Sequence, residues 1–239
     1  FVYDERMKNV TITVDDPVLE WARIEAARRG TSVSRMVGDF LGEMQRREDA
    51  YERAYLAWRT DERTWRAGAA ARRIHGFERS PAHVGEAPQP LQRSLEQPVF
   101  VDTAVLVAAE DGADAALQAP VLACLDLLWR ERLGRVSSQV LAEFYDTVTR
   151  AASAPMPHGD ARAAIRRYHS WTPWQIDAAT LETAWALEAR HQLAWGDCLA
   201  LAAAQHSGCA SLLSLSLPQG AQYGGVEVLH PLHCALAVP

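Results

Sequence analysis

The sequence predicts an α/β fold, a parallel sheet flanked by helices, preceded by a small dimerising unit and a helical arm. Three observations carry this prediction. From residue 98 to the end of the 239-residue chain, short apolar strands alternate with helical segments, which is typical of a parallel sheet with both faces covered. The chain begins instead with one short strand pattern and two amphipathic helices. Between these parts, residues 76–97 are rich in proline and glycine and poor in apolar side chains, which indicates a linker.

The N-terminal unit is predicted to occupy residues 7–49. Residues 8–14 alternate polar and apolar side chains, as a half-buried strand does. Asp15 and Pro17 indicate a helix start and Gly30 its end. The second helix has apolar side chains at helical spacing, namely Val33, Met36, Val37, Phe40, Leu41 and Met44. Because one strand has no partner in so short a unit, we expect a homodimer that pairs this strand with its copy.

With these elements in this order, residues 8–47 resemble a ribbon-helix-helix domain. The resemblance rests on K-N-V-T-I-T-V, a turn, P-V-L-E-W-A, R-R-G and T-S-V-S-R-M-V. It implies a paired ribbon that enters the major groove of operator DNA. The expected DNA contacts are Lys8, Asn9, Thr11 and Thr13 on the strand, with Ser32 and Ser34 at the start of the second helix. The alternative is that the threonines merely favour a strand, and the net acidic charge of residues 1–49 is unusual for DNA binding.

Residues 50–75 are predicted to form a helical arm that is aromatic and basic. The side chains available for contact are Trp58, Arg59, Trp65, Arg66, Arg72 and Arg73. Antitoxins of the kind that residues 8–47 resemble carry a tail that wraps a toxin. The resemblance therefore implies an arm that covers an acidic surface, with tryptophans filling grooves and arginines pairing with carboxylates. The alternative is a solvated amphipathic helix.

The C-terminal domain is predicted to occupy residues 98–239. Strands are expected at 99–101, 135–137, 171–176, 209–214 and 226–230, and helices at 113–132, 138–148, 160–169, 178–191 and 196–205. Ligands of such sheets bind beyond the carboxyl ends of the strands, so polar residues that follow a strand are the first candidates for a site.

Three carboxylates are candidates for one site at this edge. Asp102 follows the first strand, Glu143 lies on the polar side of its helix, and Asp197 lies at the start of another helix. If they converge, their hard oxygen atoms suit Mg²⁺, which lowers the pKa of a bound water and stabilises charge on phosphate. The alternative is that they are surface acids and helix caps.

Residues 99–232 resemble a PIN domain, and more closely the toxin of VapB–VapC toxin–antitoxin pairs. The resemblance is carried by F-V-D-T-A-V-L-V-A, S-S-Q-V-L-A-E-F, A-W-G-D-C-L-A-L-A-A-A and the tail L-L-S-L-S-L-P-Q-G-A-Q-Y-G-G-V-E-V-L-H-P. It implies an endoribonuclease dependent on Mg²⁺ or Mn²⁺, with Asp102, Glu143 and Asp197 as catalytic and metal-binding acids. Two positions depart from the family pattern: Ala104 replaces an asparagine, and Ser216 stands where a fourth acid is expected. Because a hydroxyl binds Mg²⁺ more weakly than a carboxylate, we expect weak or lost nuclease activity.

The sequence therefore leaves three hypotheses for a single-chain antitoxin–toxin fusion. It is a DNA-binding repressor with a vestigial nuclease, a working ribonuclease held inactive by its own arm, or an interaction protein that binds neither DNA nor RNA. The four cysteines lack C-x-x-C spacing, which favours free thiols and a cytoplasmic location. No apolar run is long enough for a membrane helix, so no membrane partner is expected.

Overall fold

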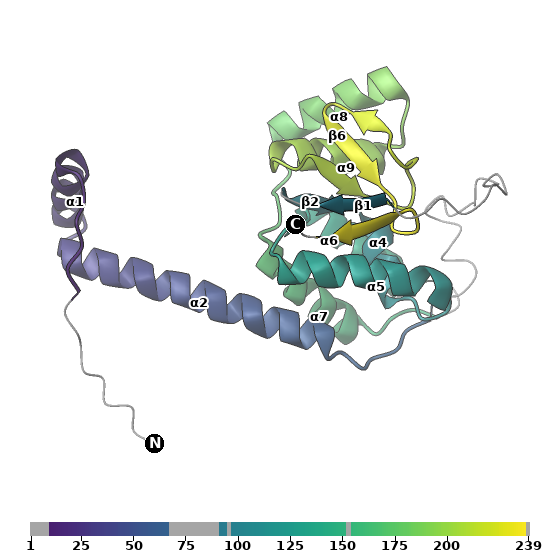
Figure 1. The fold of residues 1–239 in the computed structure, drawn as a ribbon, viewed down its shortest axis with the longest axis horizontal. Helices are drawn as coiled ribbons and strands as arrows, with labels where there is room; N and C mark the ends of the chain where they lie inside the picture. Colours follow the sequence, from purple (N-terminus) through teal and green to yellow (C-terminus); the bar gives the residue numbers. More distant parts are fainter. Residues whose placement is uncertain (1–9, 67–90, 95–96, 152–153, 238–239) are drawn as a thin grey trace. The chain divides into compact units, whose positions relative to one another are not determined.

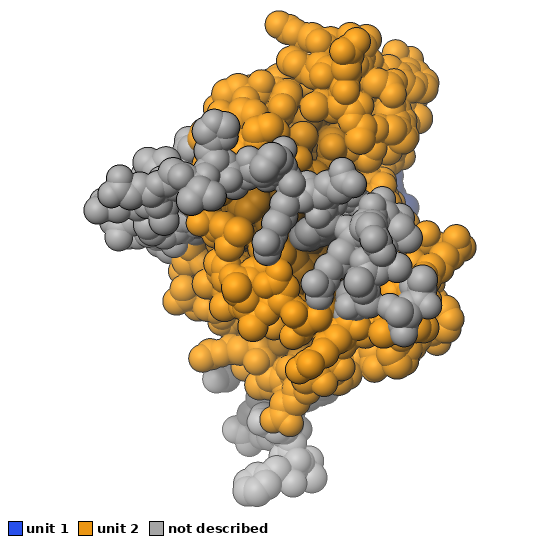
Figure 2. Space-filling view, turned by 90° about the vertical axis from the view of Figure 1, so that its right-hand side faces the viewer, with its two compact units in different colours: residues 1–50 blue, residues 51–239 orange. Residues whose placement is uncertain are grey.

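A computed structural model of the protein describes residues 10–66, 91–94, 97–151 and 154–237 (Figure 1). It divides into two compact units, residues 1–50 and 51–239, here called unit 1 and unit 2. Figure 2 colours the two units separately. No helix among the described residues has the length and apolar character needed to cross a membrane.

Unit 1 consists of two helices joined by a tight turn. Helix α1 (Asp16–Arg28) is followed by Gly30, whose φ of 65° lies in the left-handed region that glycine adopts readily. Helix α2 (Val33–Arg59) follows at once. Of the strand expected at 8–14, residues 10–14 form no strand in this single chain, and residues 8 and 9 lie outside the described part. The physical reason is that a strand requires a hydrogen-bonded neighbour, and the expected neighbour belongs to a second copy.

The secondary structure around residues 50–97 differs in part from the expectation. Helix α2 continues without a break past residue 50, the last residue of unit 1, to Arg59. The helix expected over 50–75 ends at Arg59, and residues 61–64 are irregular. Within the expected linker, β1 (Leu91–Ser94) forms a strand that pairs in parallel with β7 (Cys234–Ala237). Residues 67–90 lie outside the described part.

The main sheet of unit 2 confirms the predicted mostly parallel α/β architecture. Its strands follow the order β3-β2-β4-β6-β5. Their bounds are Val99–Val101 (β2), Gly134–Arg135 (β3), Ser211–Leu213 (β4), Gln222–Tyr223 (β5) and Val226–Leu229 (β6). All neighbours are parallel except β5 and β6, which are antiparallel. Phe100 on β2 and Leu212 on β4 are register partners with no exposed surface, because helices cover both faces of the sheet.

The helices of unit 2 flank this sheet (Figure 1). Their bounds are Thr103–Glu110 (α4), Ala115–Arg130 (α5), Ser138–Thr149 (α6), His158–Tyr168 (α7), Ala178–His191 (α8) and Trp195–His206 (α9). Helix α4 was not predicted. The strand expected at 171–176 is wrong: a short 3-10 turn (His169–Trp171) stands there, and only Trp174 forms an isolated bridge, with Ser137. Trp171 is buried, whereas Trp174 and Ile176 are half-buried, so the apolar pattern of this segment reflects packing more than strand pairing.

Trp171 packs directly over Gly134 of β3, which predicts a strong effect of adding one methyl group. A Cβ atom on Gly134 would lie 2.6 Å from three ring carbons of Trp171, which is 2% exposed. We expect Gly134→Ala to destabilise the protein by about 1–3 kcal/mol through overpacking, lowering Tm by several degrees. Gly159→Ala is the control, because no atom lies within 4 Å of its Cβ position. Equal Tm values for the two variants in a thermal unfolding experiment would contradict this packing.

Candidate functional site

The candidate site begins where β2 ends. Asp102 directly follows β2 and caps α4, with its Oδ1 accepting a hydrogen bond of 2.6 Å from the backbone N–H of Thr103. The backbone N–H of Asp102 donates to the carbonyl of Leu213 on the neighbouring strand β4. Asp102 is only 7% exposed. The sheet therefore fixes this carboxylate at its carboxyl edge and removes it from most solvent.

Two serines that follow β4 connect Asp102 to Asp197. Ser214 Oγ donates to Asp102 Oδ2 at 2.9 Å. Ser216 Oγ lies 2.8 Å from Asp197 Oδ1 and 3.3 Å from Asp102 Oδ2, within hydrogen-bond distance of both. Since one hydroxyl carries one proton, Ser216 donates to one carboxylate at a time, and the shorter contact favours Asp197. Asp102 and Asp197 therefore lie on either side of a single oxygen atom.

Glu143 joins this group from α6. Its Oε2 accepts a hydrogen bond of 2.9 Å from Thr103 Oγ1. On its other side lies Gly196 at the start of α9, where a Cβ atom would be 3.5 Å from Glu143 Oε1. The structure thus brings together the three acids selected from the sequence, here called the acid cluster: Asp102, Glu143 and Asp197. Sequence reasoning missed Thr103 and Ser214 as their hydrogen-bond donors.

Two acids of the cluster, Asp102 and Asp197, have raised pKa values. Burial raises the pKa of Asp102 to about 6, and the negative charges of Asp197 and Glu143 add to this effect. Hydrogen bonds from Ser214 and Thr103 act in the opposite direction. The pKa of Asp197 is also raised, first by burial and then by Glu143, against the hydrogen bond from Ser216. Such mutual repulsion in a site of low solvent access favours any ligand that brings positive charge.

The oxygen atoms of this site fit a hard divalent cation, because carboxylate and hydroxyl oxygens are the ligands that Mg²⁺ and Mn²⁺ prefer. Among the described residues, however, no three side chains of His, Cys, Asp or Glu are placed so as to hold a metal ion together. Ser216 occupies the position between two acids where a fourth carboxylate was expected. Ala104 is buried on α4 and offers no polar atom.

The arm, whose described residues 51–66 belong to unit 2, contacts the rest of this unit at a different place from the acid cluster. Trp58 packs on the buried Trp129, with ring centroids 6.2 Å apart. Trp65 is 9% exposed, its Nε1 donates to the carbonyl of Ala154 at 2.8 Å, and its own carbonyl accepts from Gly112 N. Gly112 follows the far end of α4, so eight helical residues, or about 12 Å, separate this contact from Asp102.

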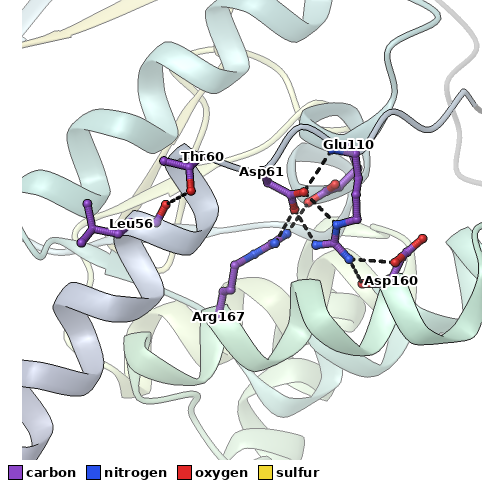
Figure 3. Close-up of polar contacts among 7 residues, drawn as sticks. Leu56, Thr60, Asp61, Glu110, Asp160 and Arg167 are labelled. Carbon is purple, nitrogen blue, oxygen red and sulfur yellow. Dashed lines mark hydrogen bonds and ion pairs between the residues drawn. The ribbon is translucent and has the colours of Figure 1, made fainter.

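The arginine interactions of the arm differ from the prediction. Arg63, which was not selected, donates to Asp160 Oδ1 at 2.9 Å and to Asp61. Asp61 also accepts from Arg167 of α7, which reaches Glu110 as well (Figure 3). A cavity of about 460 Å³ is lined in part by Trp58, Asp61, Arg63, Trp65, Glu110 and Arg167.

The two selected arginines that the structure describes make no contact with the acid cluster. Arg59 and Arg66 are exposed, whereas Arg72 and Arg73 lie outside the described part. The sequence could not identify Arg63 because the arm offers several arginines at similar spacing.

The residues selected for DNA contact are exposed or lie outside the described part. Thr11, Thr13 and Ser34 are exposed. Ser32 is exposed, and its Oγ accepts from Arg35 N at 3.2 Å, which caps α2. Lys8 and Asn9 lie outside the described residues.

Comparison with known proteins agrees with this fold. Residues 99–215 match the PIN domain family. Among solved structures, the chain is similar to VapC20 of Mycobacterium tuberculosis, described as a toxin that cleaves the sarcin–ricin loop. The identity is 22%, the match covers 48% of this chain and 86% of that chain, and the TM-score is 0.39. No curated protein matches this chain.

Proposed function

We propose that this chain, whose residues 99–215 form a PIN domain, is a single-chain antitoxin–toxin fusion with an attenuated ribonuclease site. The observation that carries the proposal is the acid cluster at the carboxyl edge of the sheet, joined through Ser216. When bound there, Mg²⁺ or Mn²⁺ would supply an activated water and positive charge for the cleaved phosphodiester. Asp102, Glu143 and Asp197 would be the ligands of the ion and would have to draw together around it.

Attenuation is proposed because of what Ser216 does between two acids. Its hydroxyl lies between the two carboxylates and donates a hydrogen bond. This hydrogen bond offsets part of the repulsion between Asp102 and Asp197, which a cation would otherwise relieve. Binding of a metal ion here would require this hydrogen bond to break and would offer one carboxylate ligand fewer than a site with four acids. Weak metal binding and slow cleavage follow.

We further propose that unit 1 dimerises and binds operator DNA. Its described residues bury little of their apolar surface, since only Ala22 and Ala26 of α1 and none of α2 are buried. The exposed large apolar side chains of this unit are Val10, Ile12, Val14, Val18, Trp21, Ile24, Phe40, Leu41 and Met44. So much exposed apolar surface on a 50-residue unit favours a second copy as its cover. Thr11 and Thr13 of the paired ribbon then face the DNA.

The test is a cleavage assay of the full chain, because the arm packs on unit 2 and a fragment starting at residue 98 would lack these contacts. We expect cleavage of single-stranded RNA in Mn²⁺ to be slow or absent, and Ser216→Asp to raise it tens-fold or more. Asp102→Asn, added to Ser216→Asp, should abolish the gain. Fast cleavage by the unaltered chain that Asp102→Asn abolishes would contradict attenuation and favour a working ribonuclease. No cleavage by any variant would contradict a ribonuclease site.

A further inference from the structure

One buried amide at the carboxyl edge of the sheet has a donor that the protein does not use. Gln139 is the second residue of α6. Its Nε2 is buried and has no hydrogen-bond partner, while its Oε1 lies 3.3 Å from Ser137 Oγ, which donates to it. A buried donor without a partner costs about 1–3 kcal/mol, so proteins rarely keep one without a use for it.

The position of Gln139 relates this donor to the acid cluster. Helix α6 follows β3, which runs parallel to β2, so the start of α6 lies at the same edge of the sheet as Asp102. Gln139 precedes Glu143 by four residues, which places both side chains on one face of the helix, with Cβ atoms about 6 Å apart. Glu143 in turn contacts Thr103. The unused amide therefore stands one helical turn from an acid of the cluster.

The other buried unpartnered groups of the described residues lie elsewhere. Trp129 Nε1, Trp171 Nε1 and Tyr168 Oη belong to one aromatic cluster, with ring centroids 4.9–5.8 Å apart. Arg167 Nε belongs to a guanidinium that already binds Asp61 and Glu110. Packing accounts for these atoms, whereas Gln139 faces the side of α6 that carries Glu143.

We propose that Gln139 is a substrate-binding residue, whose Nε2 donates a hydrogen bond to an oxygen of the RNA sugar–phosphate backbone at the acid cluster. This inference rests on the proposed ribonuclease site. An RNA backbone presents mainly oxygen acceptors, which match a group that has two N–H donors to offer. A neutral amide also approaches the carboxylates without adding charge, and it leaves the acids free for a cation.

The test measures RNA affinity and stability on the same variants. The probe is a short fluorescein-labelled single-stranded RNA, with Ca²⁺ replacing Mg²⁺ to limit cleavage. We expect Gln139→Leu to weaken binding about tenfold, as the loss of one hydrogen bond to a charged oxygen does. Its Tm should change little, because the variant removes the unsatisfied Nε2 donor and, with it, the acceptor of the Ser137 hydroxyl. A DNA strand of the same sequence distinguishes the two possible acceptors. If Gln139→Leu weakens the binding of DNA and RNA equally, the acceptor is a phosphate oxygen. If it weakens the binding of RNA alone, the acceptor is the 2′-hydroxyl.

Gln118→Leu is the matched control. Gln118 Nε2 donates to the carbonyl of Ala109 at 2.9 Å, near the far end of α4. Its loss should lower Tm and leave RNA affinity unchanged. Unchanged RNA affinity in Gln139→Leu, or an equal loss of RNA affinity in Gln118→Leu, would overturn the proposal while leaving the ribonuclease site intact. Failure of the unaltered chain to bind RNA would overturn both.

Discussion

Replacing Asp61 by asparagine is expected to destabilise unit 2 by about 3 kcal/mol, because it leaves a buried guanidinium short of negative charge. The side chain of Arg167 is 8% exposed and that of Asp61 is 14% exposed. Glu110 remains as a second partner at 3.3 Å, but burial raises the pKa of Glu110 despite the nearby Arg167. Asp61 is therefore the main compensation for the charge of Arg167.

The pH dependence of this contact follows from the pKa of Asp61. Hydrogen bonds from Arg63 and the charge of Arg167 hold that pKa below its usual value. A depressed pKa stabilises the fold above the unfolded value of about 4, and this stability is lost as the pH falls below it. Urea unfolding should therefore show the full deficit of Asp61→Asn near neutral pH and a smaller one at about pH 3.

Asp160→Asn is the control for Asp61→Asn. It removes another aspartate that Arg63 contacts, in a pair whose side chains are 38% and 42% exposed. Exposed pairs of this kind contribute less than about 1 kcal/mol. If the two variants lose the same free energy of unfolding, the burial of Arg167 does not govern the stability of the arm contact.

The sequence was sufficient for the main architecture and for the proximity of the three acids, because both depend on local patterns. A strand that ends in Asp102, a helix with Glu143 on its polar side and a helix that begins near Asp197 can each be recognised separately. Parallel strands then bring their carboxyl ends to one edge, so the topology implies their proximity.

The interactions of the arm depend on which surfaces meet, and no local pattern encodes that. Arg63 and Arg167 are two of many arginines in the chain, and their sequence positions give no sign that both contact Asp61. The continuity of α2 was missed for a related reason, since residues 45–50 carry charged side chains that look like a boundary but are compatible with an exposed helix. The role of Ser216 as a link between two acids likewise required coordinates.

Replacing Asp102 by asparagine is expected to stabilise the protein at neutral pH while removing metal-dependent behaviour. Burial and the neighbouring acids raise the pKa of Asp102 to about 6, compared with about 3.9 in an unfolded chain. The folded state therefore binds an additional proton between about pH 4 and pH 6, so stability falls as the pH rises through this window. Above it, the ionised carboxylate costs the fold about 3 kcal/mol, which Asp102→Asn should recover.

The measurement is urea unfolding in EDTA, at about pH 4 and at neutral pH, on both proteins. The free energy of unfolding of the variant should equal that of the unaltered chain at the lower pH and exceed it at neutral pH. The control is Asp146→Asn, on the exposed side of α6. It should change the free energy of unfolding by no more than about 0.5 kcal/mol at either pH. Addition of Mn²⁺ should stabilise only the protein that retains Asp102, because the ion compensates the same repulsion that the substitution removes. A variant that is less stable at neutral pH would show that Ser214 and Thr103 stabilise the carboxylate more than burial and repulsion destabilise it. The acid cluster would then be a structural network rather than a site that gives up stability for function.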